Sequence, residues 1–276
     1  MKSFVCFALL MISFSDSFAS NKKGDLIGVS DTITCDEYAN IHTEMGVLNN
    51  NVWNKHAVGK ATWKQCLISR KEENSVQYGW YWNWPKDKRT IYAYPQIKQG
   101  SSPWAPLPHF NDSIPTKIDS LTKFKVEYQL YTTSDGTFNT ATTLWLTHAT
   151  QRDNIVSPDI IAAEVMVWTQ ATEGHFSPAG RKIDSIEINN QQWEVWYQRN
   201  WSDQSGKNKN HWSIVTFKSV ENLQFVQLDI LALLRYAENS KLIQPQLFVA
   251  DIELGNEIMR GEGVSWVKYF NVSIEN

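Results

Sequence analysis

Two glutamates of this chain stand where an ordinary surface position explains them poorly. Glu164 lies in the run AEVMVW over residues 163–168, and Glu257 lies in the run GNEI over residues 255–258. Two carboxylates that face one substrate can cleave a glycosidic bond with retention of configuration, one as the nucleophile and the other as the acid and base. The two glutamates therefore predict glycoside hydrolysis.

The segment around Glu164 has the alternation of a strand with two different faces. Successive side chains of a strand point to opposite faces, so odd and even positions separate. The odd positions are small and apolar: Ala163, Val165 and Val167. The even positions are Ala162, Glu164, Met166, Trp168 and Gln170. We expect the odd face to pack in a core and the even face to present Glu164; the simpler alternative is that Glu164 is solvated.

The second carboxylate has competitors on its own strand. Asp251 and Glu253 share strand parity with Glu257, and Phe248, Ala250, Ile252 and Leu254 form the apolar face behind them. Glu253 is therefore either a second carboxylate of the same cleft or a solvated residue. Alternation alone does not choose among the three.

The thirteen tryptophans exceed what core packing usually needs. Tryptophan is seldom fully buried, and its flat apolar face suits the C–H face of a pyranose. Trp80, Trp82 and Trp84 share one face of a predicted strand over 78–84, and Trp53 follows three asparagines. We predict that these four rings bind an extended neutral glycan; the alternative is that the stripe is one wall of the core.

The first nineteen residues read as a secretory signal peptide. Lys2 is followed by an apolar stretch over 4–14 and by small residues near Ala19, and that stretch is too short to span a membrane. We expect cleavage near Ala19, one domain over 20–276, and a secreted monomer. The net charge of −3 and the absence of a basic run argue against nucleic acid, and no later apolar run predicts a membrane span.

Cys35 and Cys66 remain after removal of the leader, which carries Cys6. An even count in an exported chain predicts a disulfide between Cys35 and Cys66, and two free buried thiols are the alternative. The six histidines show no metal-ligand spacing, and no phosphate-binding or dinucleotide motif is present. We therefore expect neither a metal nor a cofactor.

Most of the remaining chain reads as short strands rich in β-branched and aromatic residues. These are 78–84, 90–94, 125–131, 140–146, 183–188, 192–198 and 211–217. Asn189 and Asn190 mark a hairpin turn. One amphipathic helix is expected over 220–239, capped by Ser219. The pattern predicts an all-β jelly-roll sandwich of two antiparallel sheets, with the helix packed outside.

In their order, several short motifs resemble glycoside hydrolase family 12, the secreted β-1,4-glucan hydrolases. They are Cys35, Asn50-Asn51 with Trp53, Cys66, GWYWNWP over 79–85, YAYP over 92–95, EVMVW over 164–168, and Gly255-Asn256-Glu257 with Gly261. The resemblance implies a jelly roll that hydrolyses cellulose-type glucan, mixed-linkage glucan or xyloglucan. It also implies Glu164 as nucleophile, Glu257 as acid and base, and substrate contacts from Asn51, Trp53, Trp80, Trp82, Trp84, Met166 and Trp168.

One position departs from the pattern of that family. An aspartate commonly neighbours the nucleophile, and Thr143 stands in its place. A threonine donates a hydrogen bond but holds no charge, so the departure bears on the nucleophile's protonation. Two alternatives to the enzyme stay open: a glycan-binding protein with weakened catalysis on the same scaffold, and a secreted protein that engages a host receptor or inhibitor.

Overall fold

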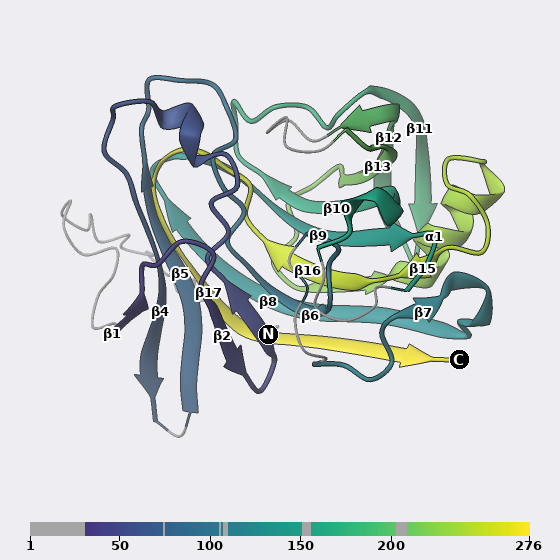
Figure 1. The fold of residues 1–276 in the computed structure, drawn as a ribbon, viewed down its shortest axis with the longest axis horizontal. Helices are drawn as coiled ribbons and strands as arrows, with labels where there is room; N and C mark the ends of the chain where they lie inside the picture. Colours follow the sequence, from purple (N-terminus) through teal and green to yellow (C-terminus); the bar gives the residue numbers. More distant parts are fainter. Residues whose placement is uncertain (1–30, 74, 105, 107–109, 151–155, 203–208) are drawn as a thin grey trace, which may run out of the picture.

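The computed structural model describes residues 31–73, 75–104, 106, 110–150, 156–202 and 209–276 (Figure 1). The expected signal peptide and its cleavage near Ala19 lie outside the described residues. Within the described part, two β-sheets form a sandwich, as the composition of the strands predicts. No helix in this part is long and apolar enough to cross a membrane.

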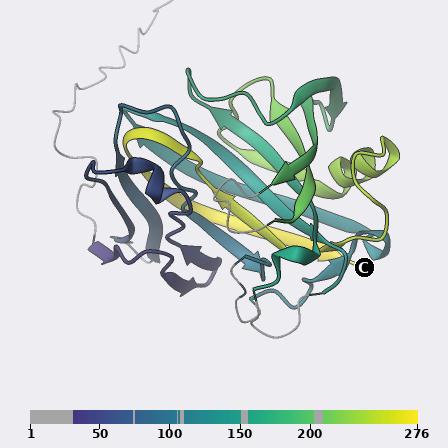
Figure 2. The same cartoon turned by 45° about the horizontal axis from the view of Figure 1, so that its top comes forward.

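The first sheet, called the outer sheet below, is antiparallel throughout. Its strands in spatial order are β1 (Asp31–Thr34), β4 (Lys64–Glu72), β5 (Ser75–Trp84), β17 (Ile258–Glu275), β8 (Lys123–Ser134) and β14 (Val226–Asp229). Figure 2 shows β17 in yellow crossing the molecule between the purple and the green strands. The first residues of β17 also pair with β9, so this strand joins the two sheets.

The second sheet, the inner sheet, carries the predicted site. Its strands in spatial order are β2 (Asn40–Thr43), β3 (Gly46–Asn49), β6 (Gln96–Gly100), β16 (Asp251–Gly255), β9 (Thr137–Thr147), β10 (Ile161–Ala171), β13 (His211–Ser219), β12 (Gln191–Ser202) and β11 (Arg181–Ile188). Two short strands, β15 (Phe248–Val249) and β7 (Thr116–Lys117), extend it beside β9. The pairing of β10 with β13 is parallel, which departs from the fully antiparallel sheets expected.

The core between the sheets confirms the alternation of the Glu164 strand. Ala163, Val165 and Val167 are buried in the main apolar cluster, whereas Met166 and Trp168 belong to a separate cluster. Because alternate side chains leave opposite faces of β10, the second cluster lies on the face turned away from the outer sheet. That face is called the open face below.

The tryptophan stripe of β5 is part of the core, and the prediction that it binds glycan is wrong. Trp80 and Trp82 are 0% exposed and Trp84 is 1% exposed. Trp84 is stacked between Trp63 and Tyr92, with ring centroids 4.4 and 5.1 Å away. The stripe lies on the face of β5 that is turned toward the inner sheet, as the hydrogen bond from Trp80 to Asn256 shows, so these rings have no face free for a sugar.

The helix is shorter than predicted and begins later. Helix α1 spans Ile230–Asn239, and its cap is Asp229, whose Oδ1 accepts a hydrogen bond from the Ala232 amide at 3.0 Å. The residues before it form β14 and pair with β8. Ser219 therefore ends β13 and caps no helix. The apolar side of α1 packs into the main core cluster at one end of the sandwich (Figure 1).

Three local predictions had different outcomes. The hairpin turn at Asn189 and Asn190 is confirmed, with φ of 53° and 63° between β11 and β12. The disulfide between Cys35 and Cys66 is present. The expected strand over 90–94 is wrong, since only an isolated bridge at Ala93 pairs there. Three 3-10 helices, η1 (Lys55–Val58), η2 (Ile118–Ser120) and η3 (Pro158–Ile160), lie in the connections.

Candidate active site

The open face of the inner sheet is built in rows across neighbouring strands. Met166 of β10 lies opposite Thr143 of β9, and Thr143 lies opposite Glu253 of β16. Lys98 of β6 lies opposite Glu253. Directly opposed residues share one face of a sheet, so all four belong to the face that carries Glu164 two residues before Met166. This row of four residues forms the bottom of the candidate site and is called its floor below.

Glu164 is held among tryptophans. Its side chain is 9% exposed in an aromatic setting, and Nε1 of Trp212 donates a hydrogen bond to its Oε2 at 3.3 Å. Trp145 lies opposite Glu164 in the sheet, and its ring packs edge-to-face on Trp212 with centroids 5.7 Å apart. Trp104 packs on both of these rings. Burial, and then the negative charge of Glu257, raise the pKa of Glu164 to about 8.

Glu257 lies between β16 and β17, outside regular strand structure, and Asn139 holds it. The Asn139 side-chain amide donates to Oε2 of Glu257, and Oδ1 of Asn139 accepts from the Glu257 amide at 3.0 Å. The Asn139 amide in turn donates to the carbonyl of Glu257 at 3.1 Å. Asn139 is fully buried, so this clamp is rigid. Burial raises the pKa of Glu257 to about 7, and the bond from Asn139 opposes that rise.

The residue before Glu257 joins the two sheets. Oδ1 of Asn256 accepts hydrogen bonds from Trp80 Nε1 at 2.8 Å and from Ser265 Oγ at 2.7 Å, both in the outer sheet. Its Nδ2 donates to the Asn139 carbonyl and to Thr140 Oγ1, each at 3.0 Å, in the inner sheet. This fully buried amide thus has a partner for each of its polar atoms. The backbone of Glu257 is fixed relative to both sheets.

The two carboxylates act on one another. After burial, the negative charge of Glu257 is the next cause that raises the pKa of Glu164. Neighbouring carboxylates lose their protons in two steps that belong to the pair. With pKa values raised to about 7 and about 8, the pair keeps a proton at neutral pH. One carboxylate and one carboxylic acid on the same face are the requirement for acid-assisted nucleophilic substitution.

Some of the predicted contact residues gather on this face. Met166 and Trp168 lie in its apolar cluster with Tyr94, and the partly exposed Trp53 packs against that cluster. Asn51 shapes the turn that carries Trp53, since its Oδ1 accepts from the Trp53 amide at 3.1 Å. Trp201 also packs there.

The sequence reasoning missed four residues of the site. Asn139 and Trp212 hold the two carboxylates, and Trp104 and Trp145 surround Trp212. Trp212 lies in the predicted strand over 211–217, but its position beside Glu164 depends on the pairing of β13 with β10, 48 residues apart along the chain. A single asparagine beside a phenylalanine gave no signal for Asn139.

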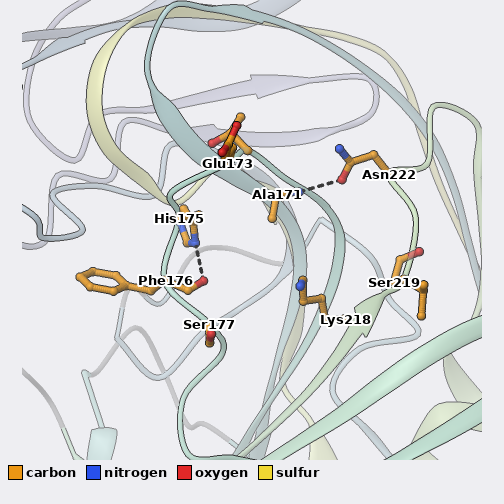
Figure 3. A pocket seen from close by; sticks show the side chains of 10 residues that line it. Ala171, Glu173, His175, Phe176, Ser177, Lys218, Ser219 and Asn222 are labelled. Atoms are coloured by element: carbon orange, nitrogen blue, oxygen red, sulfur yellow. Dashed lines mark hydrogen bonds between the residues drawn. The ribbon is translucent and has the colours of Figure 1, made fainter.

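A polar pocket of about 310 Å³ lies beyond the Trp168 end of the face (Figure 3). Its lining comes from residues 171–177 and 218–222, and Nδ1 of His175 lies 3.1 Å from the Phe176 carbonyl. The His175 ring packs edge-to-face on Trp168, with centroids 5.1 Å apart. Burial lowers the pKa of His175 to about 4, so this ring is neutral at neutral pH. The pocket adjoins the open face through these two rings and contains neither carboxylate.

Among the described residues, no group of three or more histidine, cysteine, aspartate or glutamate side chains could hold a metal ion.

Comparisons with known proteins identify the same family as the sequence motifs do. The model of "Glycosyl hydrolase family 12" matches residues 45–275. Endoglucanase S of Pectobacterium parmentieri is 24% identical over 229 residues, which cover 83% of this chain and 81% of that protein. Endoglucanase A of Aspergillus kawachii is 23% identical over 194 residues, which cover 65% of this chain and 71% of that protein.

Solved structures share the fold. A native family 12 xyloglucanase from Bacillus licheniformis superposes with a TM-score of 0.71 at 23% identity, covering 89% of this chain and 100% of that chain. Endoglucanase cel12A from Rhodothermus marinus gives a TM-score of 0.69 at 21% identity, covering 90% and 99%. With the family model spanning most of its length, this chain belongs to glycosyl hydrolase family 12 and is a glycoside hydrolase of the cellulase-like kind.

Proposed function

We propose that this protein is a secreted endo-β-1,4-glucanase that cleaves β-glucan with retention, using Glu164 as the nucleophile and Glu257 as the acid and base. The observation that carries the proposal is the pair of buried carboxylates, coupled across one face, with pKa values raised to about 8 and about 7. A family 12 chain acts on polysaccharide, and Glu164 lies on the open face two residues before Met166 of the aromatic cluster.

The reaction has two steps. The Glu164 carboxylate attacks the anomeric carbon and forms an ester while the glycosidic C–O bond breaks, and Glu257 gives its proton to the departing oxygen. Glu257, now a carboxylate, takes a proton from water, which attacks the same carbon and releases Glu164. The free carboxyl groups must therefore hold one proton between them at the start. Each carboxylate accepts one hydrogen bond that favours its charged form, from Trp212 to Glu164 and from Asn139 to Glu257, so the two roles are assigned from the family motifs and not from the order of the pKa values.

The surface beside the carboxylates suits a neutral sugar chain. Trp53 is partly exposed against the cluster of Met166 and Trp168, and a half-exposed indole offers a flat apolar face to a pyranose. We assign the glucan chain to this surface, with Asn51 ordering the turn of Trp53. The choice among cellulose-type glucan, mixed-linkage glucan and xyloglucan is left to the assay below.

Secretion is proposed from two features. The charged and apolar pattern over residues 1–19 has the form of a signal peptide, and the described chain carries a disulfide between Cys35 and Cys66. A disulfide persists in an oxidising compartment, which agrees with export.

The direct test is reducing-sugar release from barley β-glucan, carboxymethyl cellulose and xyloglucan. Wild type should release sugar from at least one of them, and Glu164→Gln should release none while melting as a folded protein. Proton NMR of the first product should show the β anomer, as retention requires. An α anomer would rule out retention, and a folded wild type inactive on all three would favour the glycan-binding alternative.

A further inference from the structure

A buried charged cluster on the same face takes no part in the two steps above. Glu253 is 4% exposed, and Asp251 and Lys98 are both 0% exposed. Three ionisable side chains buried together are costly unless their charges compensate. Because they lie on the floor of the active site, these charges can act on the catalytic groups.

The sheet places this cluster beside the nucleophile. Glu253 lies opposite Lys98 on one side and opposite Thr143 on the other. Thr143 lies opposite Met166, whose strand carries Glu164 two residues earlier. Glu253 is therefore one strand beyond the threonine that stands next to the nucleophile.

Two hydroxyl groups of the described chain, those of Thr143 and Tyr94, lie between Glu253 and the strand of Glu164. Oγ1 of Thr143 lies 3.2 Å from the Tyr94 hydroxyl, and that hydroxyl donates to the Ala141 carbonyl at 2.9 Å. Burial and the negative charge of Glu253 raise the pKa of Tyr94 well above its ordinary value, so it stays neutral. Thr143 and Tyr94 are both neutral, so they do not compensate the negative charge of Glu253 as it acts on Glu164.

The charges within the cluster follow from the neighbours. Burial raises the pKa of Glu253, and the ammonium of Lys98 acts against that rise. Burial and the charge of Glu253 raise the pKa of Asp251 well above its ordinary range, while its Oδ1 accepts from the Trp145 amide at 3.1 Å. Of these two acids, Asp251 therefore holds its proton more strongly, and Glu253 is the one whose charged form Lys98 favours.

We propose that Glu253 is a positioning residue of this active site, which keeps a fixed negative charge beside Glu164 where Thr143 holds none. Lys98 keeps Glu253 ionised, and Asp251 is the uncharged member of the cluster. The inference rests on the proposed function of Glu164 as nucleophile. Among the described residues, the charged or titratable groups that interact with Glu253 are Lys98 on β6, Asp251 on its own strand, and Tyr94 and Glu164 across the face.

The charge has a defined effect on the nucleophile. A negative neighbour disfavours the ionised form of Glu164, and Glu253 is among the groups that raise the pKa of Glu164. Glu164 must be ionised to attack, so its ionisation sets the acidic limb of the pH profile of kcat/KM. Removal of the Glu253 charge should move that limb to lower pH.

The experiment compares pH profiles of kcat/KM on soluble β-glucan. Glu253→Gln keeps the shape of the side chain and removes its charge, so its acidic limb should lie roughly one pH unit below that of wild type. Asp251→Asn is the matched control, because a neutral acid becomes a neutral amide, and its limb should coincide with wild type. The double variant Glu253→Gln/Thr143→Asp restores a carboxylate one strand away, so its limb should return toward wild type.

The opposite results are equally clear. The proposal is wrong if the acidic limb of the kcat/KM profile of folded Glu253→Gln lies at the wild-type pH. It is also wrong if Asp251→Asn shifts that limb as far as Glu253→Gln does. Should Glu253→Gln fail to fold, the double variant decides alone: a limb at the wild-type pH supports the proposal, and a folded but inactive protein contradicts it.

A substrate-free measurement separates this inference from the proposed function. The Glu164 carboxyl carbon is titrated by ¹³C NMR in wild type and Glu253→Gln, and its signal is assigned by its absence in Glu164→Gln. A downward shift of its midpoint in Glu253→Gln supports the role of Glu253 even if wild type hydrolyses no glucan, which would refute only the proposed function. An identical midpoint in both proteins overturns the role of Glu253 even in an active enzyme.

Discussion

Glu164 and Glu257 are each held in a fixed orientation, but by different parts of the structure. Glu164 lies within a regular strand, among tryptophans, with one hydrogen bond from Trp212 at 3.3 Å. Glu257 lies between two strands, and Asn139 holds both its carboxylate and its backbone. The sheet itself orients the first carboxylate, whereas a side-chain clamp orients the second. The first should therefore tolerate loss of its hydrogen-bond partner better than the second.

The largest expected difference between the two carboxylates appears when the leaving group is changed. On β-glucan, Glu164→Gln and Glu257→Gln should each lose roughly 10⁴-fold or more in kcat/KM. On an aryl β-cellobioside with a dinitrophenolate leaving group, no proton is needed for bond cleavage. Glu257→Gln should then give a burst of phenolate, and Glu164→Gln should give none.

Stopped-flow absorbance of the released phenolate checks this contrast. A burst from Glu164→Gln and none from Glu257→Gln would reverse the two roles. Equal loss on both substrates would assign Glu257 to something other than proton donation.

The next effect concerns the clamp on Glu257. Asn139→Ala removes the bond to Oε2 and the bond that Oδ1 accepts from the Glu257 amide, so we expect about a 10²-fold loss of kcat on β-glucan, because the acid is misplaced. Trp212→Phe removes one bond from Glu164, which the strand still orients, so its loss should be about tenfold.

Initial rates on β-glucan and thermal melts of both variants test the clamp. A larger loss in Trp212→Phe than in Asn139→Ala, with both proteins folded, would contradict the division between sheet and clamp. Asn271→Ala, at an exposed position of β17, is the control for general effects of asparagine removal.

The last effect is on stability rather than on rate, and it depends on pH. The pKa of Glu164 is about 8 in the folded protein and near its ordinary value of 4.5 when unfolded. Both states are protonated below pH 4.5; above it the unfolded state ionises first, so stability is lost as pH rises toward 8. Glu164→Gln should therefore raise the free energy of unfolding at pH 8 by on the order of 4 kcal/mol, with no gain at pH 4.

Urea unfolding at pH 4 and pH 8 measures the difference. Glu127→Gln, an exposed position of β8, serves as the control and should change little at either pH. A gain from Glu164→Gln that is the same at both pH values would show that packing, and not ionisation, explains it.

The sequence predicted the sandwich and the face of Glu164 because both depend on local alternation. It did not predict the fate of the β5 tryptophans, because a period of two separates two faces without saying which one is covered. Trp80 is buried only because β17 and the inner sheet lie around it, and those contacts come from residues far along the chain. The helix began too early in the prediction because Val226 and Leu228 fit either an apolar helix face or a strand paired with β8.

The site was predicted in part for the same reason. Glu164 stood out within one segment, whereas the clamp on Glu257 joins residues 118 positions apart. Glu253 was recognised as a carboxylate of the right parity, yet its burial depends on Lys98 from another strand. Contacts of this kind can be predicted only when the register between neighbouring strands is known.

The Asn256 junction has a consequence for which positions can vary. Ser265 lies in the outer sheet and holds Asn256 at 2.7 Å, while Thr132 holds Ser265 at 2.8 Å. Neither hydroxyl belongs to the open face, yet both lie on the line of hydrogen bonds that ends at the residue before Glu257. A library selected for glucan cleavage should reject most substitutions at Ser265 almost as strictly as at Asn139. The positions that tolerate few substitutions in this enzyme would then be those linked to Glu257 by hydrogen bonds, even where they lie far from the bound sugar.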